Sequence, residues 1–183
     1  MNGIRVFLED TLRLRINAQK SAVARPWGRK FLGFSVTAQR ETRLRIAKPS
    51  VQRLMHRVRE LLRAGRGRSL SHTIETLNPL LRGWINYFQL TESRAALDEL
   101  DGWLRRRLRC LLWRQWRRPR TRRRKLRALG LDEERARVSS GNGYGAWWNA
   151  GASHMNQALP TAYFARLGLV SLLHQWQRLQ GVR

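Results

Sequence analysis

Arginine side chains interleaved with aromatic residues are the part of this sequence best suited to chemistry with a ligand. A guanidinium group pairs with phosphate oxygens and also stacks on exposed bases. For any single arginine a solvated helix face is the alternative, and Trp113 and Trp116 are expected to pack in the core. The pattern predicts phosphate contacts with a folded RNA by Arg82, Arg105, Arg106, Arg109, Arg114, Arg120, Arg122, Arg123, Arg124 and Lys125.

The charge of the whole chain supports that prediction. Lysine and arginine number 37 against 12 acidic residues in 183, which gives a net charge of +25. A compact fold tolerates such self-repulsion best when a polyanion neutralises it, so nucleic acid is the expected partner. An anionic membrane surface is the second candidate, but no insertion into a membrane is expected, because every apolar run is shorter than the roughly 18 residues of a spanning helix.

The acidic residues are poorly placed for metal-assisted phosphoryl transfer, which needs carboxylates converging on divalent cations. Glu9 and Asp10 are adjacent on a predicted helix and therefore diverge. Asp98, Glu99 and Asp101 are better explained as the acidic first turn of a helix. The sequence therefore predicts no catalytic residue and no metal site.

Other candidate sites are equally weak. The four histidines lack the spacing of a zinc site, and Cys110 is expected to be a buried structural thiol. Gly141, Gly143 and Gly145 are not followed by the Lys-Ser or Lys-Thr of a phosphate-binding loop, so they are expected to be structural. No cofactor is predicted.

The elements that must position the arginines are mainly helical, with a few strands near the N-terminus. The alternation of Leu12, Leu14 and Ile16 predicts a strand, and 31–36 with 44–46 predict a hairpin. Ser50 is expected to cap a helix ending near Gly65.

Three further stretches complete the expected elements. A helix opening at Ser71 and reaching Phe88 should kink or restart at Pro79. The clearest helix is expected at 94–118, with leucines on one stripe and arginines on its other faces. A basic linker should begin at Pro119, a loop should span 139–148, and weak helices at 158–167 and 169–179 should be split at Gly168.

Several short sequence motifs say more about the family of this chain than its composition does. They are Phe31-Leu32-Gly33-Phe34, Leu81-Arg82-Gly83-Trp84-Ile85-Asn86-Tyr87-Phe88, Asp101-Gly102-Trp103-Leu104-Arg105-Arg106-Arg107-Leu108-Arg109 and Tyr163-Phe164-Ala165-Arg166-Leu167-Gly168-Leu169. In type and order they resemble the bacterial group II intron reverse transcriptase/maturase family. The resemblance covers nearly the whole chain.

The resemblance implies an α+β fold that is mainly α, in three parts. Residues 1–48 would be a small antiparallel remnant of the polymerase palm, in which Asn17, Lys20 and Ser21 follow the catalytic loop and Phe31, Leu32, Gly33 and Phe34 form a primer-grip-like hairpin. Residues 49–118 would be the helical thumb, or maturase domain X, with Trp84 and Leu108 as internal supports. Residues 119–183 would be a basic linker and a C-terminal segment that binds nucleic acid.

The function implied by the resemblance is binding of group II intron RNA and assistance with its splicing. The family's Tyr-Ala-Asp-Asp loop does not occur in the sequence, so no reverse transcription is expected from this chain alone. Target DNA is a further expected partner, and a cytoplasmic location is expected because residues 1–10 lack the features of a secretory signal.

Three alternatives remain open. A separately encoded polymerase half could complete a split reverse transcriptase, and Mg2+ would then enter as a cofactor. The chain could instead be a non-functional remnant of a mobile element, or a generic basic DNA-binding module.

Overall fold

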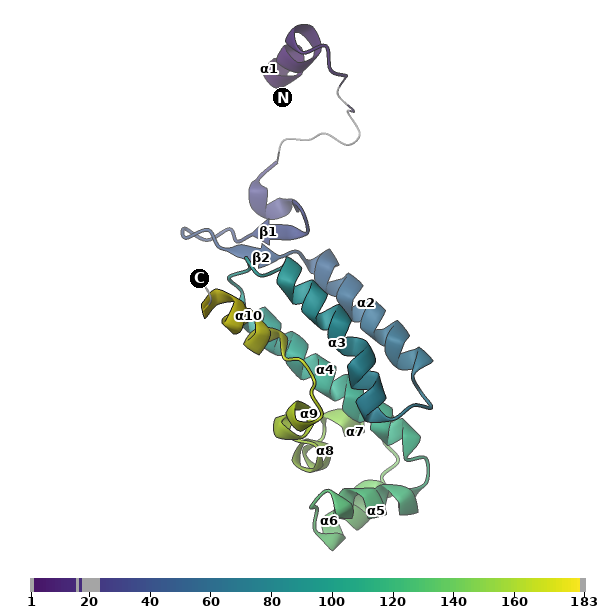
Figure 1. Cartoon of the computed structure of the whole chain (residues 1–183). Helices are drawn as coiled ribbons and strands as arrows, with labels where there is room; N and C mark the ends of the chain where they lie inside the picture. Colours follow the sequence, from purple (N-terminus) through teal and green to yellow (C-terminus); the bar gives the residue numbers. More distant parts are fainter. Residues whose placement is uncertain (1, 16, 18–23, 182–183) are drawn as a thin grey trace.

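The computed structural model describes residues 2–15, 17 and 24–181, and it is mainly helical with one small sheet. An N-terminal helical segment lies apart from the body in Figure 1, and below the hairpin the helices α2, α3 and α4 lie side by side. The N-terminal elements are α1 (Asn2–Val6), η1 (Phe7–Thr11), η2 (Pro26–Gly28), β1 (Phe34–Val36) and β2 (Leu44–Ile46). The remaining helices are α2 (Lys48–Ala64), α3 (Leu70–Tyr87), α4 (Arg94–Gln115), α5 (Pro119–Ala128), α6 (Glu133–Ser140), α7 (Ala146–Gly151), α8 (Ser153–Ala158), α9 (Thr161–Arg166) and α10 (Leu172–Gly181).

The sequence prediction of a mainly helical α+β fold with a small antiparallel sheet is confirmed. β1 pairs antiparallel with β2, with Phe34 opposite Ile46 and Val36 opposite Leu44. The sheet packs on the bundle through Ile46 and partly buried Phe34. The predicted hairpin therefore exists.

The predicted strand over 12–16 is wrong in the part that the structure describes. Leu12 follows η1, and Leu12 and Leu14 are about half exposed. No strand pairs with this stretch among the described residues. A segment of alternating apolar and polar residues is not stable as a strand without the hydrogen bonds of a neighbouring strand. Ile16, Lys20 and Ser21 lie outside the described residues.

The helix predicted from Ser50 is present, but its cap is different. α2 starts at Lys48 with Ala47 as the N-cap residue and Pro49 in its first turn, where a missing N–H costs nothing. Ser50 is buried instead, and its hydroxyl donates to the Gly33 carbonyl at 3.1 Å. Contact with the hairpin thus decides the role of this serine.

The predicted kink or restart at Pro79 does not divide α3, which is one helix from Leu70 to Tyr87. Leu77 and Leu81 on either side of the proline are fully buried, while the proline itself is exposed. Burial of these neighbours offsets the lost hydrogen bond. Ser69, two residues before Ser71, caps the helix by accepting from the His72 amide at 3.2 Å.

The core lies where α2, α3 and α4 meet, and α10 packs against α3 and α4. The leucine stripe predicted on α4 faces this core, with Leu97, Leu104 and Leu108 at 1% exposure or less. Trp113 and Cys110 are also buried, as predicted, and the Trp113 ring centroid lies 5.6 Å from that of His154 in α8. The core fixes which faces of α4 remain for a ligand.

The C-terminal third is more regular than the sequence predicted. The basic run that was predicted as a linker or domain edge forms helix α5, which packs on α6 and has the fully buried Leu126. The predicted loop is confirmed only over 141–145, because its last residues open α7. Gly168, at φ +80°, ends α9 before α10, as predicted.

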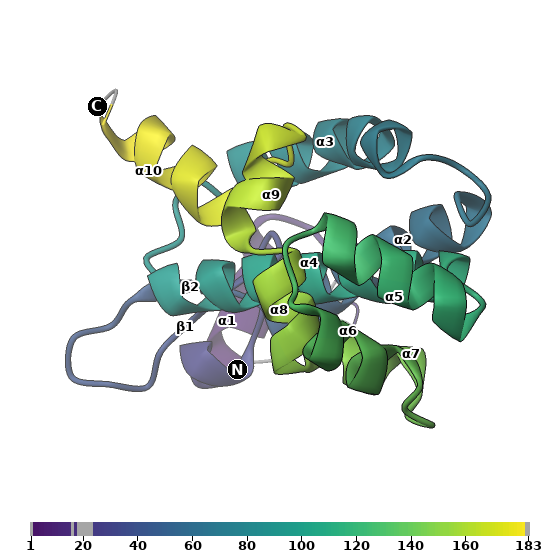
Figure 2. The same ribbon diagram turned by 90° about the horizontal axis from the view of Figure 1, so that it is seen from below.

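Two views agree on the arrangement of this part. In Figures 1 and 2, α8 and α9 lie between α10 and the pair formed by α5 and α6. The C-terminal segment is therefore packed on the bundle along the length of α4.

Candidate nucleic-acid interface

A groove lined by arginines runs between the C-terminal end of α2, the α2–α3 connection and α4. It consists of two adjoining cavities of about 300 and 780 Å³ that share Arg66, Leu111 and Arg114. We call it the basic groove; its seven arginines are Arg59, Arg63, Arg66, Arg68, Arg107, Arg114 and Arg117. No acidic residue lines it in the described part of the chain.

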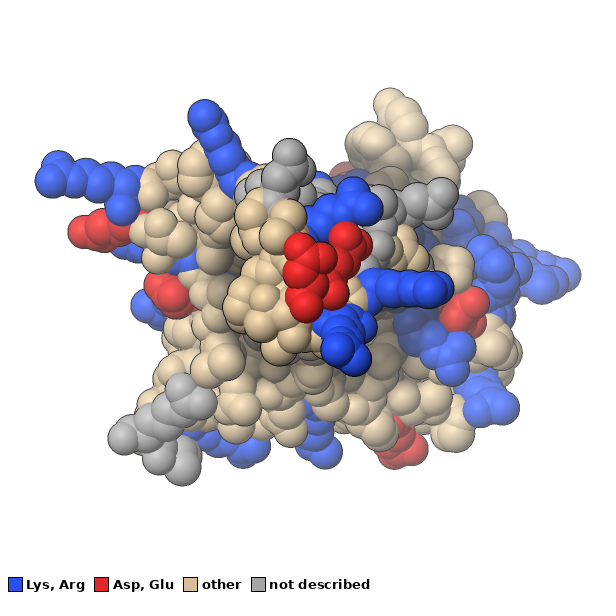
Figure 3. Space-filling view, turned by 90° about the horizontal axis from the view of Figure 1, so that it is seen from above, with Lys and Arg blue, Asp and Glu red and all other residues tan. Residues whose placement is uncertain are grey.

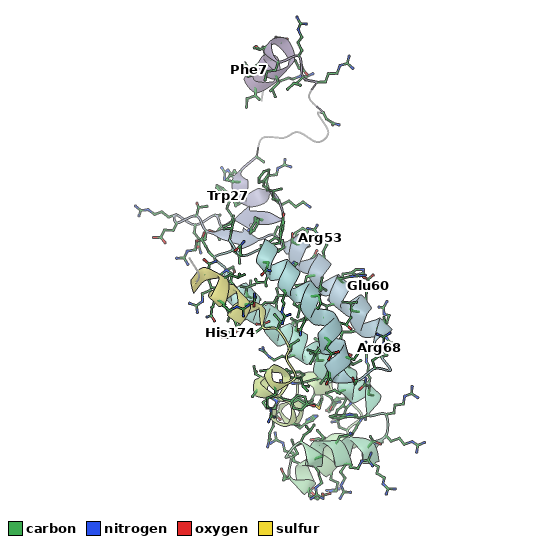
Figure 4. All side chains as sticks on the ribbon, viewed as in Figure 1. Phe7, Trp27, Arg53, Glu60, Arg68 and His174 are labelled. Atoms are coloured by element: carbon green, nitrogen blue, oxygen red, sulfur yellow. The ribbon has the colours of Figure 1, made fainter. Side chains whose placement is uncertain are left out.

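Hydrogen bonds from one side chain to backbone carbonyls hold the two walls of the basic groove together. The side-chain amide of Gln115, at the end of α4, donates to the carbonyls of Arg66 at 3.1 Å and Arg68 at 2.9 Å. Arg68 also contacts His72 at 2.6 Å between Nη1 and Nε2. In Figure 4, Arg68 lies at the end of the bundle remote from Trp27 and Phe7. The groove is therefore a fixed feature of the bundle and independent of the hairpin.

Crowding of like charges makes the basic groove receptive to anions. Burial lowers the pKa of Arg107, and repulsion from Arg59 adds to the effect. The Nε of Arg107 is buried without a hydrogen-bond partner among the described residues. A phosphate beside these guanidinium groups would relieve the repulsion and form charge-assisted hydrogen bonds.

Charge is unevenly balanced over the rest of the surface too. On the face seen from above, Lys and Arg side chains project both at the margins and around a central acidic group, while Asp and Glu form a few small groups (Figure 3). Some of the acids are paired with arginine, as Glu60 is with Arg57 at 3.0 Å and Glu134 is with Arg137 at 2.6 Å. Each such pair reduces the negative charge that would repel a polyanion.

The arginines predicted from sequence do not form one cluster. Arg114 lines the basic groove, Arg82 is exposed on α3, and Arg105 is half-buried on α4. Exposed residues on α5 that have no ion pair among the described residues are Arg120, Arg124 and Lys125.

Arg109 must be removed from the predicted phosphate contacts. It is only 7% exposed, and its Nε and Nη2 donate to the Leu159 carbonyl at 3.0 and 2.8 Å. Burial lowers its pKa to about 10, and repulsion from Arg105 adds to this shift. Its role is to join α4 to the end of α8, because an unpaired carbonyl there would be costly.

Three more of the predicted arginines have protein partners. Arg106 donates to the Trp147 carbonyl at 3.1 Å from Nη2, and Arg122 donates to the Trp116 carbonyl at 2.8 Å. Arg123 is paired with Glu133. These side chains support the C-terminal segment, and a phosphate could reach only the parts that stay exposed.

Sequence reasoning missed six arginines of the basic groove, although part of the signal was present. Arg59, Arg63 and Arg66 follow each other at helical spacings of four and three residues, and Arg107 and Arg114 are seven apart. Arg59 and Arg63 therefore lie on one face of α2, with Arg66 just beyond its end, and Arg107 and Arg114 lie on one face of α4. What the spacing could not give is that the two faces look onto the same groove.

The primer-grip-like turn is tightly docked on the bundle but apolar at its tip. Leu32 has φ +49° and its carbonyl accepts from the Tyr87 hydroxyl at 2.9 Å. Gly33 has φ +82°, and a Cβ there would lie 3.0 Å from the Ser50 hydroxyl and 3.1 Å from the Phe88 ring. Phe31 and Leu32 are 79% and 66% exposed.

The acids do not assemble a metal site. Within the described ranges, no group of three His, Cys, Asp or Glu residues could hold an ion. Asp101 is buried and caps α10 instead: it accepts from the Ser171 hydroxyl at 2.6 Å and the Leu172 amide at 2.8 Å. The Mg2+ of a polymerase does not fit the acids of the described part of the chain. None of the helices in the described part is long and apolar enough to cross a bilayer.

Comparison with known proteins places the basic groove in a family context. None of the curated proteins compared with the chain matches it. Residues 51–130 match the family described as group II intron, maturase-specific domain. The match contains every arginine of the basic groove and extends past the boundary predicted at residue 118 to include α5. Residues 51–130 therefore carry the maturase-specific domain of group II intron proteins, which supports a maturase C-terminal region.

Proposed function

We propose that this chain binds group II intron RNA and assists its splicing, with the basic groove as the main seat of the RNA backbone. The observation that carries the proposal is the convergence of seven arginines, without an acid among the described lining residues, inside the matched domain. Guanidinium groups held by a rigid bundle neutralise phosphates whose spacing is set by the RNA fold.

The exposed cations of α5 extend this surface. Arg120, Arg124 and Lys125 are exposed, whereas Leu126 of the same helix is fully buried. They would contact a second segment of the intron RNA or the target DNA. Binding of this kind needs no cofactor held by the chain.

To assist splicing, the protein must recognise one particular RNA fold in addition to binding the phosphates by charge. Double-stranded RNA is recognised mainly by shape and backbone, and sequence is recognised in unpaired regions. The experiment compares a cognate group II intron with an unrelated structured RNA of equal length at equal salt, using protein freed of nucleic acid. Tighter binding and faster splicing of the intron are expected; equal affinities would remove the maturase proposal.

A second candidate is the C-terminal half of a split RNA-directed DNA polymerase. Its support is the apolar surface at the hairpin: Trp27, Phe31 and Leu32 are between 41% and 79% exposed, and an apolar cavity of about 410 Å³ lies beside them. Such a surface is typical of an interface with another protein part. Mixing the chain with a polymerase half that carries the catalytic aspartates should restore primer extension with Mg2+, and no extension would reject this candidate.

A further inference from the structure

A pair of stacked aromatic rings is exposed at the start of α7. The ring centroids of Tyr144 and Trp148 lie 4.0 Å apart with 26° between the planes, yet the residues remain 59% and 49% exposed. Trp147 beside them is 37% exposed. Large rings left in water forgo burial energy that a core position would supply, so packing alone does not explain this position.

The pair is held in place from beneath. Asn149 is fully buried, and its side-chain amide exchanges hydrogen bonds with that of Asn142 at 2.8 and 3.0 Å. Asn149 also donates to the Tyr144 carbonyl at 2.9 Å, and the Tyr144 amide donates to Asn142 at 3.1 Å. A partly buried amide pair thus fixes the loop that carries the exposed Tyr144 ring, and the platform is preorganised.

A series of cations and rings connects this platform to the basic groove. The guanidinium carbons of Arg106 and Arg107 lie 4.2 and 4.5 Å from the Trp147 ring centroid. Arg107 and Arg59, both of which line the groove, also lie 5.2 and 5.5 Å from Trp103. The charges therefore continue from the groove to the aromatic pair.

Gly151 makes one of these contacts possible. A Cβ at this position would lie 2.7 Å from the guanidinium carbon of Arg106. Because Gly151 has no side chain, the Arg106 guanidinium can donate to the Trp147 carbonyl and also lie over the Trp147 ring.

We propose that Tyr144 and Trp148 stack with an unpaired base of the RNA whose phosphates occupy the basic groove. The proposal rests on the proposed RNA binding and adds to it a site that distinguishes unpaired from paired nucleotides. Bases stack on exposed aromatic rings wherever they are free of their own partners, and cations beside the rings attract the adjoining phosphate. An RNA segment with an unpaired base fits both features of the surface, because its base can stack on the rings and its phosphates can pair with the cations.

The test measures the affinity of the full chain for an RNA stem-loop and for a blunt RNA duplex with the same number of phosphates. The loop carries 2-aminopurine, whose fluorescence falls when it stacks. Tyr144→Ala and Trp148→Ala are each expected to weaken stem-loop binding by about 5-fold to 150-fold, the range of one lost base stack, and to abolish the quenching. Duplex binding should change by less than about 2-fold, because the groove is intact.

Two controls keep the result interpretable. Trp148→Phe retains a ring and should recover most of the stem-loop affinity, and Val138→Ala removes an exposed apolar side chain of α6 without touching the platform. Equal losses for stem-loop and duplex, or no loss for either, would overturn the proposal. Dependence on the two rings for a DNA stem-loop but not for the RNA would overturn it too.

The outcome is separable from the proposed function. If the basic groove does not bind RNA, duplex affinity is absent or insensitive to salt for the unmodified protein. If only the stacking site is wrong, salt-dependent duplex binding persists and the aromatic variants match the unmodified chain on both RNAs.

Discussion

Replacing three arginines of the basic groove should change the salt dependence of RNA binding by a calculable amount. Each neutralised phosphate contributes roughly 0.7 to 0.9 to the slope of log affinity against log salt concentration. If all seven groove arginines pair with phosphates, the groove supplies a slope of roughly 5 to 6. Arg63→Gln, Arg66→Gln and Arg114→Gln together should therefore lower the slope by roughly 2 to 3.

The assay is fluorescence anisotropy with labelled intron RNA over a salt series. Between about 50 and 200 mM salt, the groove contribution of the unmodified chain should cost about a thousandfold in affinity, and that of the triple variant about a hundredfold. The three side chains are exposed and have no partner in the described part of the chain, so the free energy of unfolding should stay within about 0.5 kcal/mol.

A matched control removes the same charge elsewhere. Arg94, Arg166 and Arg178 are exposed on α4, α9 and α10 and do not line the basic groove. Their change to Gln should lower the slope by less than about 1, because they contact at most one phosphate. If both triple variants lower the slope equally, net charge and not the groove carries the binding, and the reasoning from geometry is refuted.

Three further predictions concern the fold that holds the interface. Gly33→Ala should destabilise the chain by about 1–3 kcal/mol in urea unfolding, because φ +82° and the close Ser50 and Phe88 leave no room for a methyl group. Asp101→Ala should cost about 1–3 kcal/mol and speed proteolysis within α10, since it removes the acceptor for that helix's first amides. Burial first, and repulsion from a nearby arginine second, lower the pKa of His154 from its ordinary value of 6.5, so the unfolded chain takes up the proton first. Thermal stability should therefore be greatest above about pH 6.5 and fall as the pH drops below it, and His154→Gln should reduce that fall.

Each of these has a contrary outcome. An alanine at residue 33 that leaves the urea midpoint unchanged would mean the turn can rearrange. Unaltered protection of α10 in the Asp101 variant would show that packing against α3 and α4 is sufficient. A melting temperature equally dependent on pH with and without His154 would assign the effect to other groups.

Much of the bundle follows from local patterns. Leucines at helical spacing predicted α3 and α4 because a 3.6-residue period places them on one buried face whatever the partner is. The hairpin followed from two extended segments and an intervening polar run. Pro49 was the missed local signal for the start of α2, because proline is favoured in a first turn.

The sequence by itself determined the helical periodicity, the basic charge and the family motifs, because each is a property of neighbouring residues. Only the tertiary structure decided which arginines are available to a ligand. Arg109 is not available to a phosphate because it donates to the Leu159 carbonyl, fifty residues away along the chain. Arg59 and Arg114 line the same cavity only because α2 and α4 come together in the folded chain. The stacked rings at Tyr144 likewise depend on the Asn142–Asn149 pair. Side-chain partners distant along the chain are set by how helix faces pack, which spacing within one helix cannot specify.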